Sequence, residues 1–241
     1  MIELLLGIIV NFVSYLLGFA TRWAIARYRI KGQRRFWAPL LKGRGALSVV
    51  LTDKEGKSPR SPRKVSLTDV HAYSDVRSVL NSLGKEVEIK ARSQANVVEL
   101  AKGCFISLGG PLANGVSEYV LIRLGQRLPV KFLIDEKCFE FEGAKFSASY
   151  DINQLVERDY GLVIRLQKLD PADITSKPVL VAFGLHGHGT QQIVKAILTD
   201  ENLASQFKPF LSGDFYALMK FEFNNHEVTR KSVISVEKIR C

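Results

Sequence analysis

The sequence predicts an N-terminal transmembrane helix followed by an α/β domain, and three observations carry this prediction. Residues 4–20 are apolar except for Asn11 and Ser14. From residue 46 onward, short apolar runs typical of buried strands alternate with stretches of helical periodicity. Two of those apolar runs end in glycine-rich turns that open helices. Strands that alternate with helices indicate a mostly parallel sheet covered by helices on both faces.

The apolar run of residues 4–20 is at the short end of a membrane span, since roughly 17–25 residues are needed to cross the hydrocarbon core. A cleaved signal peptide would carry its positive residues before the apolar run, whereas here they follow it. We therefore divide the chain into a transmembrane anchor (1–21), a basic juxtamembrane segment (22–44) and a cytosolic α/β domain (45–241).

The juxtamembrane segment contains eight Lys and Arg residues and no acidic residue. Its arginines include Arg22, Arg27, Arg29, Arg34 and Arg35. Positive flanks stay in the cytoplasm, so we expect a single-pass protein of the inner membrane with its domain inside the cell. Removing these eight charges from the formal net charge of +10 leaves +2 for the rest. This favours contact with anionic lipid headgroups over direct binding of nucleic acid.

An alternative is an amphipathic helix lying on the membrane surface, because four aromatic residues interleave with the basic ones. Within the apolar run, Gly7, Asn11, Ser14 and Gly18 lie four, three and four residues apart and share one helical stripe. Small and polar residues on one stripe let helices associate in a membrane. The stripe predicts a homo-oligomer, although a lone anchor could also tolerate these residues.

The three cysteines have no metal-ligand spacing, and an odd number fits a reducing compartment rather than a disulfide framework. His186 and His188 lie two residues apart, and a zinc site with Asp69 or His71 is conceivable. Because no third ligand follows from the spacing, we predict no metal.

In the first half of the domain, the residue pattern predicts a strand at 46–52 and then a mobile basic loop. It next predicts a helix that begins with Asp69 as N-cap and ends at Gly84. Strands at 87–91 and 104–108 and a helix at 116–124 follow. Residues 130–166 alternate loosely and predict a hairpin insertion.

The second half predicts a buried strand at 178–183 and a helix that Thr190 caps. Residues 215–223 and 228–239 alternate around Asn224 and Asn225, which predicts a closing hairpin. The expected architecture is a doubly wound, flavodoxin-like or Rossmann-like sheet, mostly parallel, with antiparallel additions.

The two glycine-rich turns are the candidate binding site. A turn that opens a helix presents backbone N–H groups and the positive helix end, which favour an anion. Since ligands of open α/β sheets bind beyond the carboxyl ends of the strands, both turns could line one crevice. The residues are Gly109, Gly110, Asn114, His186, Gly187, His188, Gly189, Thr190 and Asp69. The alternative is that the glycines only make tight turns, that Asn114 fixes its own turn and that Asp69 is a helix cap.

Neither turn matches a nucleotide fingerprint. The run from Gly184 to Thr190 lacks the lysine of a P-loop, and its glycine spacing is not that of a dinucleotide fold. The cofactor therefore stays unknown. No serine, cysteine or paired-carboxylate arrangement stands out either, so catalytic residues stay unassigned and an enzyme is not indicated.

Three segments together, 106–114 (ISLGGPLAN), 159–161 (DYG) and 179–190 (VLVAFGLHGHGT), resemble an uncharacterised bacterial α/β domain and, more distantly, the outer domain of archaeal S-layer proteins. The Gly-Gly-Pro-x-x-Asn element is the most specific part. The resemblance covers about residues 46–198 and implies no active site. The plan of a membrane segment fused to a cytosolic α/β domain is similar to that of membrane effectors in bacterial anti-phage systems.

These observations predict a membrane-anchored sensor-effector. Its domain would bind a nucleotide-like anion or a partner defence protein and oligomerise to act on the membrane. The alternative is a membrane-tethered enzyme acting on a nucleotide or sugar phosphate, and a purely structural scaffold is a third hypothesis.

Overall fold

A computed structural model describes residues 14, 15, 18, 33–43, 45–54, 64–170, 172–173, 176–199 and 201–239. The chain divides into two compact units, Met1–Trp37 and Ala38–Cys241. The second unit contains the α/β domain.

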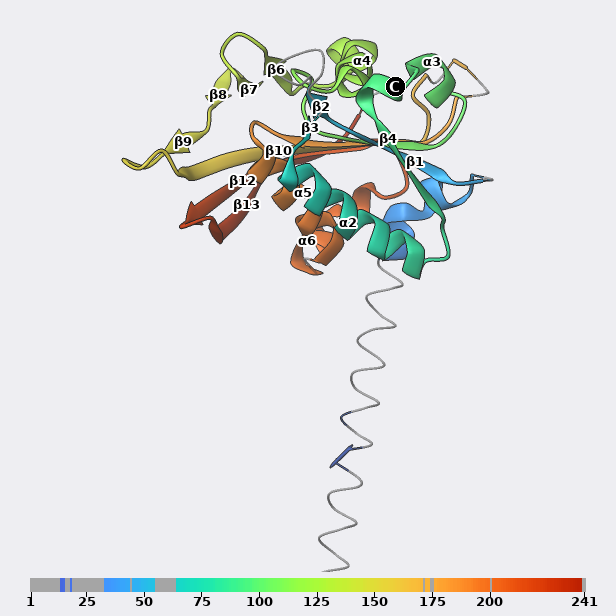
Figure 1. Ribbon diagram of the computed structural model, residues 1–241, viewed down its shortest axis with the longest axis horizontal. Helices are drawn as coiled ribbons and strands as arrows, with labels where there is room; N and C mark the ends of the chain where they lie inside the picture. Colours follow the sequence, from blue (N-terminus) through green and yellow to red (C-terminus); the bar gives the residue numbers. More distant parts are fainter. Residues whose placement is uncertain are drawn as a thin grey trace, which may run out of the picture. The chain divides into compact units, whose positions relative to one another are not determined.

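The domain is organised around one mixed sheet with the strand order β13-β12-β10-β11-β5-β1-β4 (Figure 1). Four neighbouring strands are parallel: β4 (Val87–Ala91), β1 (Leu47–Leu51), β5 (Phe105–Leu108) and β11 (Val179–Gly184). The other half is antiparallel and consists of β10 (Val156–Leu166), β12 (Phe215–Asn224) and β13 (Glu227–Lys238), with β9 (Ser149–Tyr150) beside β10. The α/β class is confirmed, but the sheet is mixed rather than mostly parallel.

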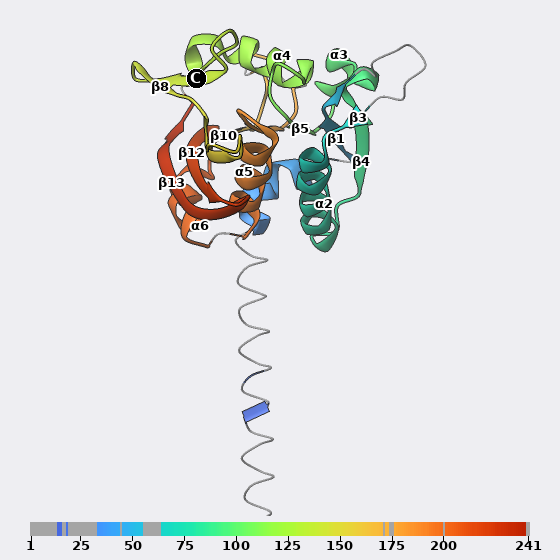
Figure 2. The same ribbon diagram turned by 60° about the vertical axis from the view of Figure 1, so that its left-hand side comes forward.

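Helices cover both faces of this sheet (Figures 1 and 2). One face carries α2 (Leu67–Ser82), α5 (Gly187–Thr199) and α6 (Glu201–Phe207). The opposite face carries α3 (Val97–Leu100) and α4 (Gly115–Leu124) together with a small sheet of β6 (Lys131–Leu133), β7 (Cys138–Phe141) and β8 (Ala144–Phe146). Short 3-10 turns follow at Arg92–Gln94, Gly125–Arg127 and Lys208–Phe210.

The burial of each strand matches its position in the sheet. Every residue of β5 and β11 is buried, because helices cover them on both faces, and such strands read as continuous apolar runs. β13 carries exposed Lys and Glu residues, which suits a sheet edge because charged side chains discourage pairing with another chain. Phe139 of the small sheet packs against Phe183 of β11, with ring centroids 5.5 Å apart, and so joins the two sheets.

The predicted closing hairpin is confirmed as β12 and β13, with Asn224 paired to Glu227. The two turn residues, Asn225 and His226, both have positive φ angles, 47° and 68°. A two-residue hairpin turn of this kind matches the twist of the flanking strands.

The predicted insertion at 130–166 is only partly correct. The small sheet is an insertion, but residues 156–166 form β10, which lies inside the main sheet between β11 and β12. The pattern of the sequence did not predict this strand as part of the main sheet, because exposed Glu157 and Arg158 near its start precede eight consecutive buried residues. The segment therefore does not alternate along its length. A further short ribbon, β2 (Asp53–Lys54) with β3 (Lys64–Val65), brackets the basic loop.

The predicted membrane segment lies mostly outside the described residues. Gly7, Asn11, Arg22, Arg27 and Arg29 are among the residues not described, while Ser14 and Gly18 are helical positions. Residues 33–41 are helical, and Arg34 and Arg35 are exposed. Over the described ranges, no helix is both long and apolar enough to cross a membrane.

Candidate functional site

The carboxyl ends of the four parallel strands meet at one edge of the sheet. There β4 leads into Arg92, β1 into Thr52 and Asp53, β5 into Gly109, and β11 into Leu185. β11 pairs in parallel with β5 and antiparallel with β10. The turn after β11 therefore lies at the border between the parallel and the antiparallel half of the sheet. Open α/β sheets bind ligands at this kind of edge.

Gly109 is required by the geometry of the first turn. Its φ angle is +101°, which L side chains rarely adopt, and a Cβ there would collide with Thr52 Oγ1 and lie 3.7 Å from Asp69 Oδ2. A Cβ on Gly110 would lie 3.3 Å from the Phe183 ring and 3.5 Å from the Gly184 carbonyl oxygen. The two glycine-rich turns thus lie side by side.

Asn114 is held inside its own turn. Its side chain is fully buried, donates from Nδ2 to the Leu108 carbonyl at 2.9 Å and accepts the Val116 N–H at 3.1 Å as the cap of α4. Ser117 donates to the Gly109 carbonyl at 2.7 Å and pairs with Ser107 at 2.8 Å. The alternative that Asn114 fixes its own turn therefore matches the structure.

Arg92 lies beside the start of α4. Its Nε and one terminal nitrogen are each 3.7 Å from the position of a Cβ on Gly115, the first residue of the helix. Asp53 is buried and holds the segment after β4, since its carboxylate accepts the Ser93 N–H at 3.1 Å and the Ser93 hydroxyl at 2.6 Å. A guanidinium and a positive helix end are thus placed next to the Gly109–Gly110 turn.

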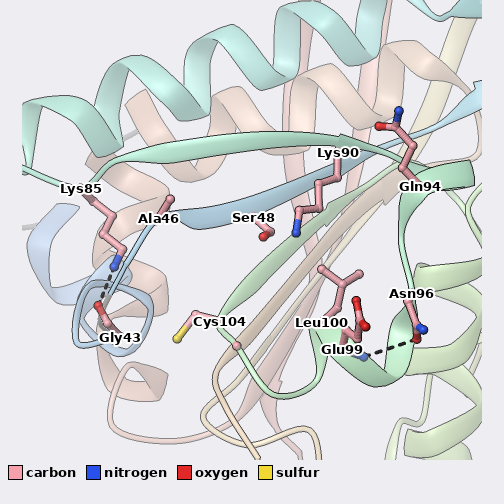
Figure 3. A pocket seen from close by; sticks show the side chains of 11 residues that line it. Gly43, Ala46, Ser48, Lys85, Lys90, Gln94, Asn96, Glu99, Leu100 and Cys104 are labelled. Carbon is pink, nitrogen blue, oxygen red and sulfur yellow. Dashed lines mark hydrogen bonds between the residues drawn. The ribbon is translucent and has the colours of Figure 1, made fainter.

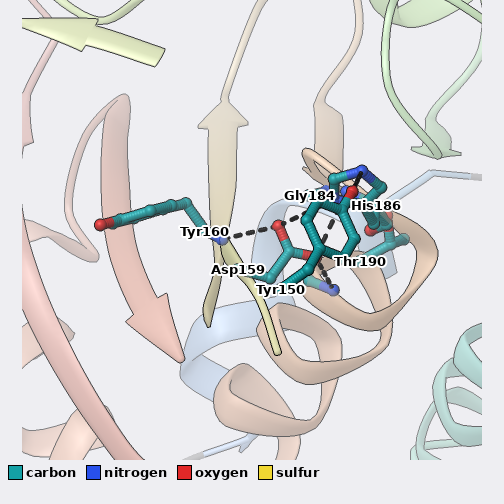
Figure 4. A network of polar contacts seen from close by, with 7 residues as sticks. Tyr150, Asp159, Tyr160, Gly184, His186 and Thr190 are labelled. Carbon is teal, nitrogen blue, oxygen red and sulfur yellow. Dashed lines mark hydrogen bonds and ion pairs between the residues drawn. The ribbon is translucent and has the colours of Figure 1, made fainter. Parts of the chain in front are cut away.

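The backbone N–H groups at the start of α5 are already bonded to a carboxylate of the chain itself. Asp159 of β10 is fully buried, and its Oδ2 accepts the N–H groups of Gly189 at 2.7 Å and His186 at 3.2 Å (Figure 4). Its Oδ1 accepts the Tyr160 N–H at 2.8 Å. A Cβ on Gly189 would lie 2.7 Å from Oδ2, so only glycine permits this approach. The Asp159 carboxylate therefore occupies, at the start of α5, the place of the anion that the glycine-rich turn predicts.

His186 links this buried carboxylate to the surface. Its Nε2 is 2.5 Å from the Tyr150 hydroxyl, and its Nδ1 is 3.7 Å from Asp159 Oδ1 (Figure 4). Burial and the Asp159 charge raise the pKa of the Tyr150 phenol. The protonated phenol can donate to Nε2, while Nδ1 is buried and has no hydrogen-bond partner within the part of the chain that the structure describes.

Two further histidines, His188 and His226, lie near Asp159 and His186. The His188 and His226 rings stack with centroids 5.4 Å apart, and His188 meets the edge of Phe223 at 5.9 Å. Burial and the proximity of His226 lower the pKa of His188, with Asp159 opposing. No group of three or more metal-ligating side chains occurs among the described residues.

Two capping predictions are wrong. α5 begins at Gly187, and Thr190 lies within its first turn, where its Oγ1 accepts the Gly184 N–H at 2.9 Å. α2 begins at Leu67 after Ser66, so Asp69 is a buried residue of the first turn rather than the cap. Gly187 is needed because a Cβ there would collide with Thr68 Oγ1, and this contact joins the starts of α2 and α5.

Sequence reasoning missed four residues of this edge: Tyr150, Asp159, Arg92 and His226. Each comes from an element outside the glycine-rich turns, so the turn pattern could not indicate them. The sequence does contain one indication of the role of Asp159, because an acidic residue directly before the apolar stretch 160–164 is unusual in a central strand.

A separate polar hollow of about 130 Å³ is lined by residues of β1, β4 and α3 and of the segments that flank them (Figure 3). Lys85, almost fully buried, donates there to the carbonyls of Gly43 at 2.6 Å and Gly45 at 2.7 Å. Cys104 lines the same hollow, and burial raises the pKa of its thiol. Cys104 is thus a half-buried thiol packed against Gly43 rather than a reactive thiolate.

Comparison with protein-family models, with curated proteins and with solved structures yields no match to this chain. The resemblance to an uncharacterised bacterial α/β domain therefore stays a prediction.

Proposed function

We propose that this protein is a membrane-anchored sensor whose domain binds a nucleotide-like anion at the carboxyl edge of the parallel strands. The observation that carries the proposal is the Arg92 guanidinium beside the first residue of α4, next to the Gly109–Gly110 turn. A guanidinium binds phosphate oxygens strongly, and the positive end of a helix adds to the attraction for an anion.

The site differs from the one expected from the sequence in one respect. Because Asp159 already accepts the N–H groups of His186 and Gly189 at the start of α5, we assign the phosphate to the Arg92 guanidinium beside the first residue of α4. His186, His188 and Tyr150 would then contact the remainder of the ligand.

The test is thermal unfolding of the full chain in detergent with a panel of mono-, di- and cyclic nucleotides. At a hundred times its dissociation constant, a bound nucleotide stabilises the fold by about 2.7 kcal/mol. For a chain of this size, that raises the unfolding midpoint by about 5–10 °C. Arg92→Gln should remove this shift, and the matched control Arg77→Gln on the exposed side of α2 should keep it. A shift that survives Arg92→Gln contradicts the assignment, and no shift with any nucleotide favours a partner protein.

The output of the sensor is proposed to be oligomerisation at the membrane, in the manner of anti-phage effectors. A ligand drives such a change only if the oligomer binds it more tightly than the monomer does. Deletion of residues 1–21 should abolish the cellular effect. If the effect persists without them, the membrane part of the proposal is wrong.

A second candidate, a membrane-tethered enzyme acting on a nucleotide or sugar phosphate, is favoured by the linked Tyr150, His186 and Asp159. His186 would act as the general base, since the raised pKa of Tyr150 disfavours a phenolate. This candidate predicts a converted nucleotide after incubation. His186→Gln should abolish conversion without unfolding the domain, and His71→Gln on α2 should not. Recovery of the nucleotide unchanged supports the sensor instead.

A further inference from the structure

β4 is the outermost parallel strand of the main sheet (Figure 2). It pairs with β1 and, within the described part of the chain, with no other strand. The Leu47 N–H donates to the Glu86 carbonyl at 2.9 Å, and this bond fixes the direction of the backbone groups along β4. The backbone groups of Glu88 and Lys90 face β1, so those of Ile89 face away from the sheet.

The outward groups at this edge are the N–H groups of Ile89 and Ala91 and the carbonyls of Val87 and Ile89. Among the residues that the structure describes, none of these groups has a hydrogen-bond partner. Ile89 also leaves an aliphatic side chain at the edge that is 51% exposed. Unpaired backbone groups beside an exposed apolar side chain form a template for one more strand.

The other edge of the sheet is protected against such pairing, whereas β4 is not. The pairing of β13 with β12 shifts register twice, and β13 carries neighbouring Arg230 and Lys231. Register shifts and charges of one sign hinder the approach of another strand. β4 keeps one continuous register with β1, contains no proline and carries one charge of each sign, on Glu88 and Lys90.

The sequence of β4, VEIKA, is complementary to itself when two copies run antiparallel. About a two-fold axis at Ile89, each Ile89 N–H meets the Ile89 carbonyl of the other copy, and each Ala91 N–H meets a Val87 carbonyl. These are the groups that point outward. The same register places each Glu88 directly opposite a Lys90, with Cα atoms about 4.5 Å apart and both side chains on one face.

The two charges of β4 also select this register over its neighbours. Within one chain, the Lys90 ammonium lies 3.6 Å from the Glu88 carboxylate, and both side chains remain partly exposed. In the antiparallel pair, two ammonium and two carboxylate groups alternate, so each charge gains a second partner of opposite sign. A shift of one strand by two residues would instead place Glu88 opposite Glu88 or Lys90 opposite Lys90, which is unfavourable.

We propose that β4 pairs antiparallel with β4 of a second copy of this chain, so that one continuous sheet runs through both copies. A second copy is the occupant that this edge fits, because the outward backbone groups, the contact between two Ile89 side chains and the opposite charges all match in one register. A two-fold interface uses one such self-complementary patch twice. This inference rests on the proposed oligomerisation of the chain and names the surface that forms it.

The first test is disulfide cross-linking of the full chain in detergent, in a Cys241→Ser background. In the proposed register the two Ile89 Cα atoms lie about 5.5 Å apart, within the range that a disulfide spans. Mild oxidation of the Ile89→Cys chain should therefore double the apparent mass of most of the protein. Ile122→Cys is the matched control, since Ile122 is 71% exposed but lies on α4.

The second test reverses the charges and measures the dimer association constant by sedimentation equilibrium in detergent. Glu88→Lys places a lysine opposite each Lys90 and should lower the constant about tenfold. Adding Lys90→Glu to this variant re-creates pairs of opposite charge and should restore the constant. Glu118→Lys is the matched control, because it changes the net charge equally at an exposed position of α4. Circular dichroism verifies that each variant is folded.

The proposal is overturned if Ile89→Cys cross-links no better than Ile122→Cys, or if the double variant associates as weakly as Glu88→Lys. Sedimentation of the wild-type chain separates this failure from that of the proposed function. An oligomeric chain without a β4 cross-link refutes the β4 interface alone and assigns the contact to another surface. A chain that stays monomeric, with and without the nucleotides of the thermal panel, refutes both the interface and the proposed oligomerisation.

Discussion

The buried Asp159 carboxylate should be a main determinant of the domain's stability. It accepts three backbone N–H groups, from Tyr160, His186 and Gly189, and it ties β10 to the start of α5. Asp159→Asn keeps the shape of the side chain but replaces one accepting oxygen with an NH₂ group. Even in its best orientation, with the oxygen toward Gly189, the amide loses at least the bond from Tyr160.

The expected cost follows from these contacts. A hydrogen bond to a charged group contributes about 1.5–3 kcal/mol, and a buried donor left without an acceptor adds to the loss. We therefore expect Asp159→Asn to lower the free energy of unfolding by about 2–3 kcal/mol, equivalent to about 5–10 °C in the unfolding midpoint. Asp159→Ala leaves all three donors unpaired and should cost more.

The assay is thermal unfolding of the full chain in detergent, followed by circular dichroism. Glu157→Gln is the matched control, because Glu157 lies on the same strand but is exposed. That control should change the free energy of unfolding by less than about 0.5 kcal/mol. An Asp159→Asn variant as stable as Glu157→Gln would refute the role given to the carboxylate.

Three further predictions concern other parts of the domain. Gly109→Ala should cost about 2–4 kcal/mol through its positive φ angle and its collision with Thr52, while Gly213→Ala, which has open space, should be nearly neutral by urea unfolding. Lys85→Met should cost about 2–4 kcal/mol because it leaves two carbonyls without their donor, and exposed Lys102→Met should not, by the same assay. Folding lowers the pKa of His188, so the unfolded chain takes up its proton first and stability should fall as the pH drops below about 6.5. His188→Phe should flatten this loss between pH 7.5 and 5.5, and exposed His71→Phe should keep the wild-type slope.

Much of the fold follows from local pattern. The apolar runs that became β1, β5 and β11 are continuous, as strands buried on both faces must be. The helical period of residues 193–198 and the turn at Asn225 likewise predict α5 and the closing hairpin. Each of these signals depends only on neighbouring residues, so it can be read without knowledge of the rest of the chain.

The candidate site could be predicted only in part for the same reason. Gly109, Gly110 and Gly187 are positions where a Cβ would meet another element, and the glycine itself is the local signal of that contact. Arg92 and Tyr150 gave no such signal, because Arg92 comes from the 3-10 turn after β4 and Tyr150 from β9, both far from the glycine-rich turns in the sequence.

The sequence by itself determined the α/β class, the glycine-rich turns at one sheet edge and the concentration of positive charge in residues 22–44. Only the tertiary structure decided that β10 enters the sheet antiparallel and brings Asp159 beneath α5. The physical reason is that a buried carboxylate needs several N–H donors at once, and two of its three donors, His186 and Gly189, lie 27 and 30 positions away in the chain. Which turn remains available for a ligand is therefore settled by long-range pairing and not by the composition of the turn.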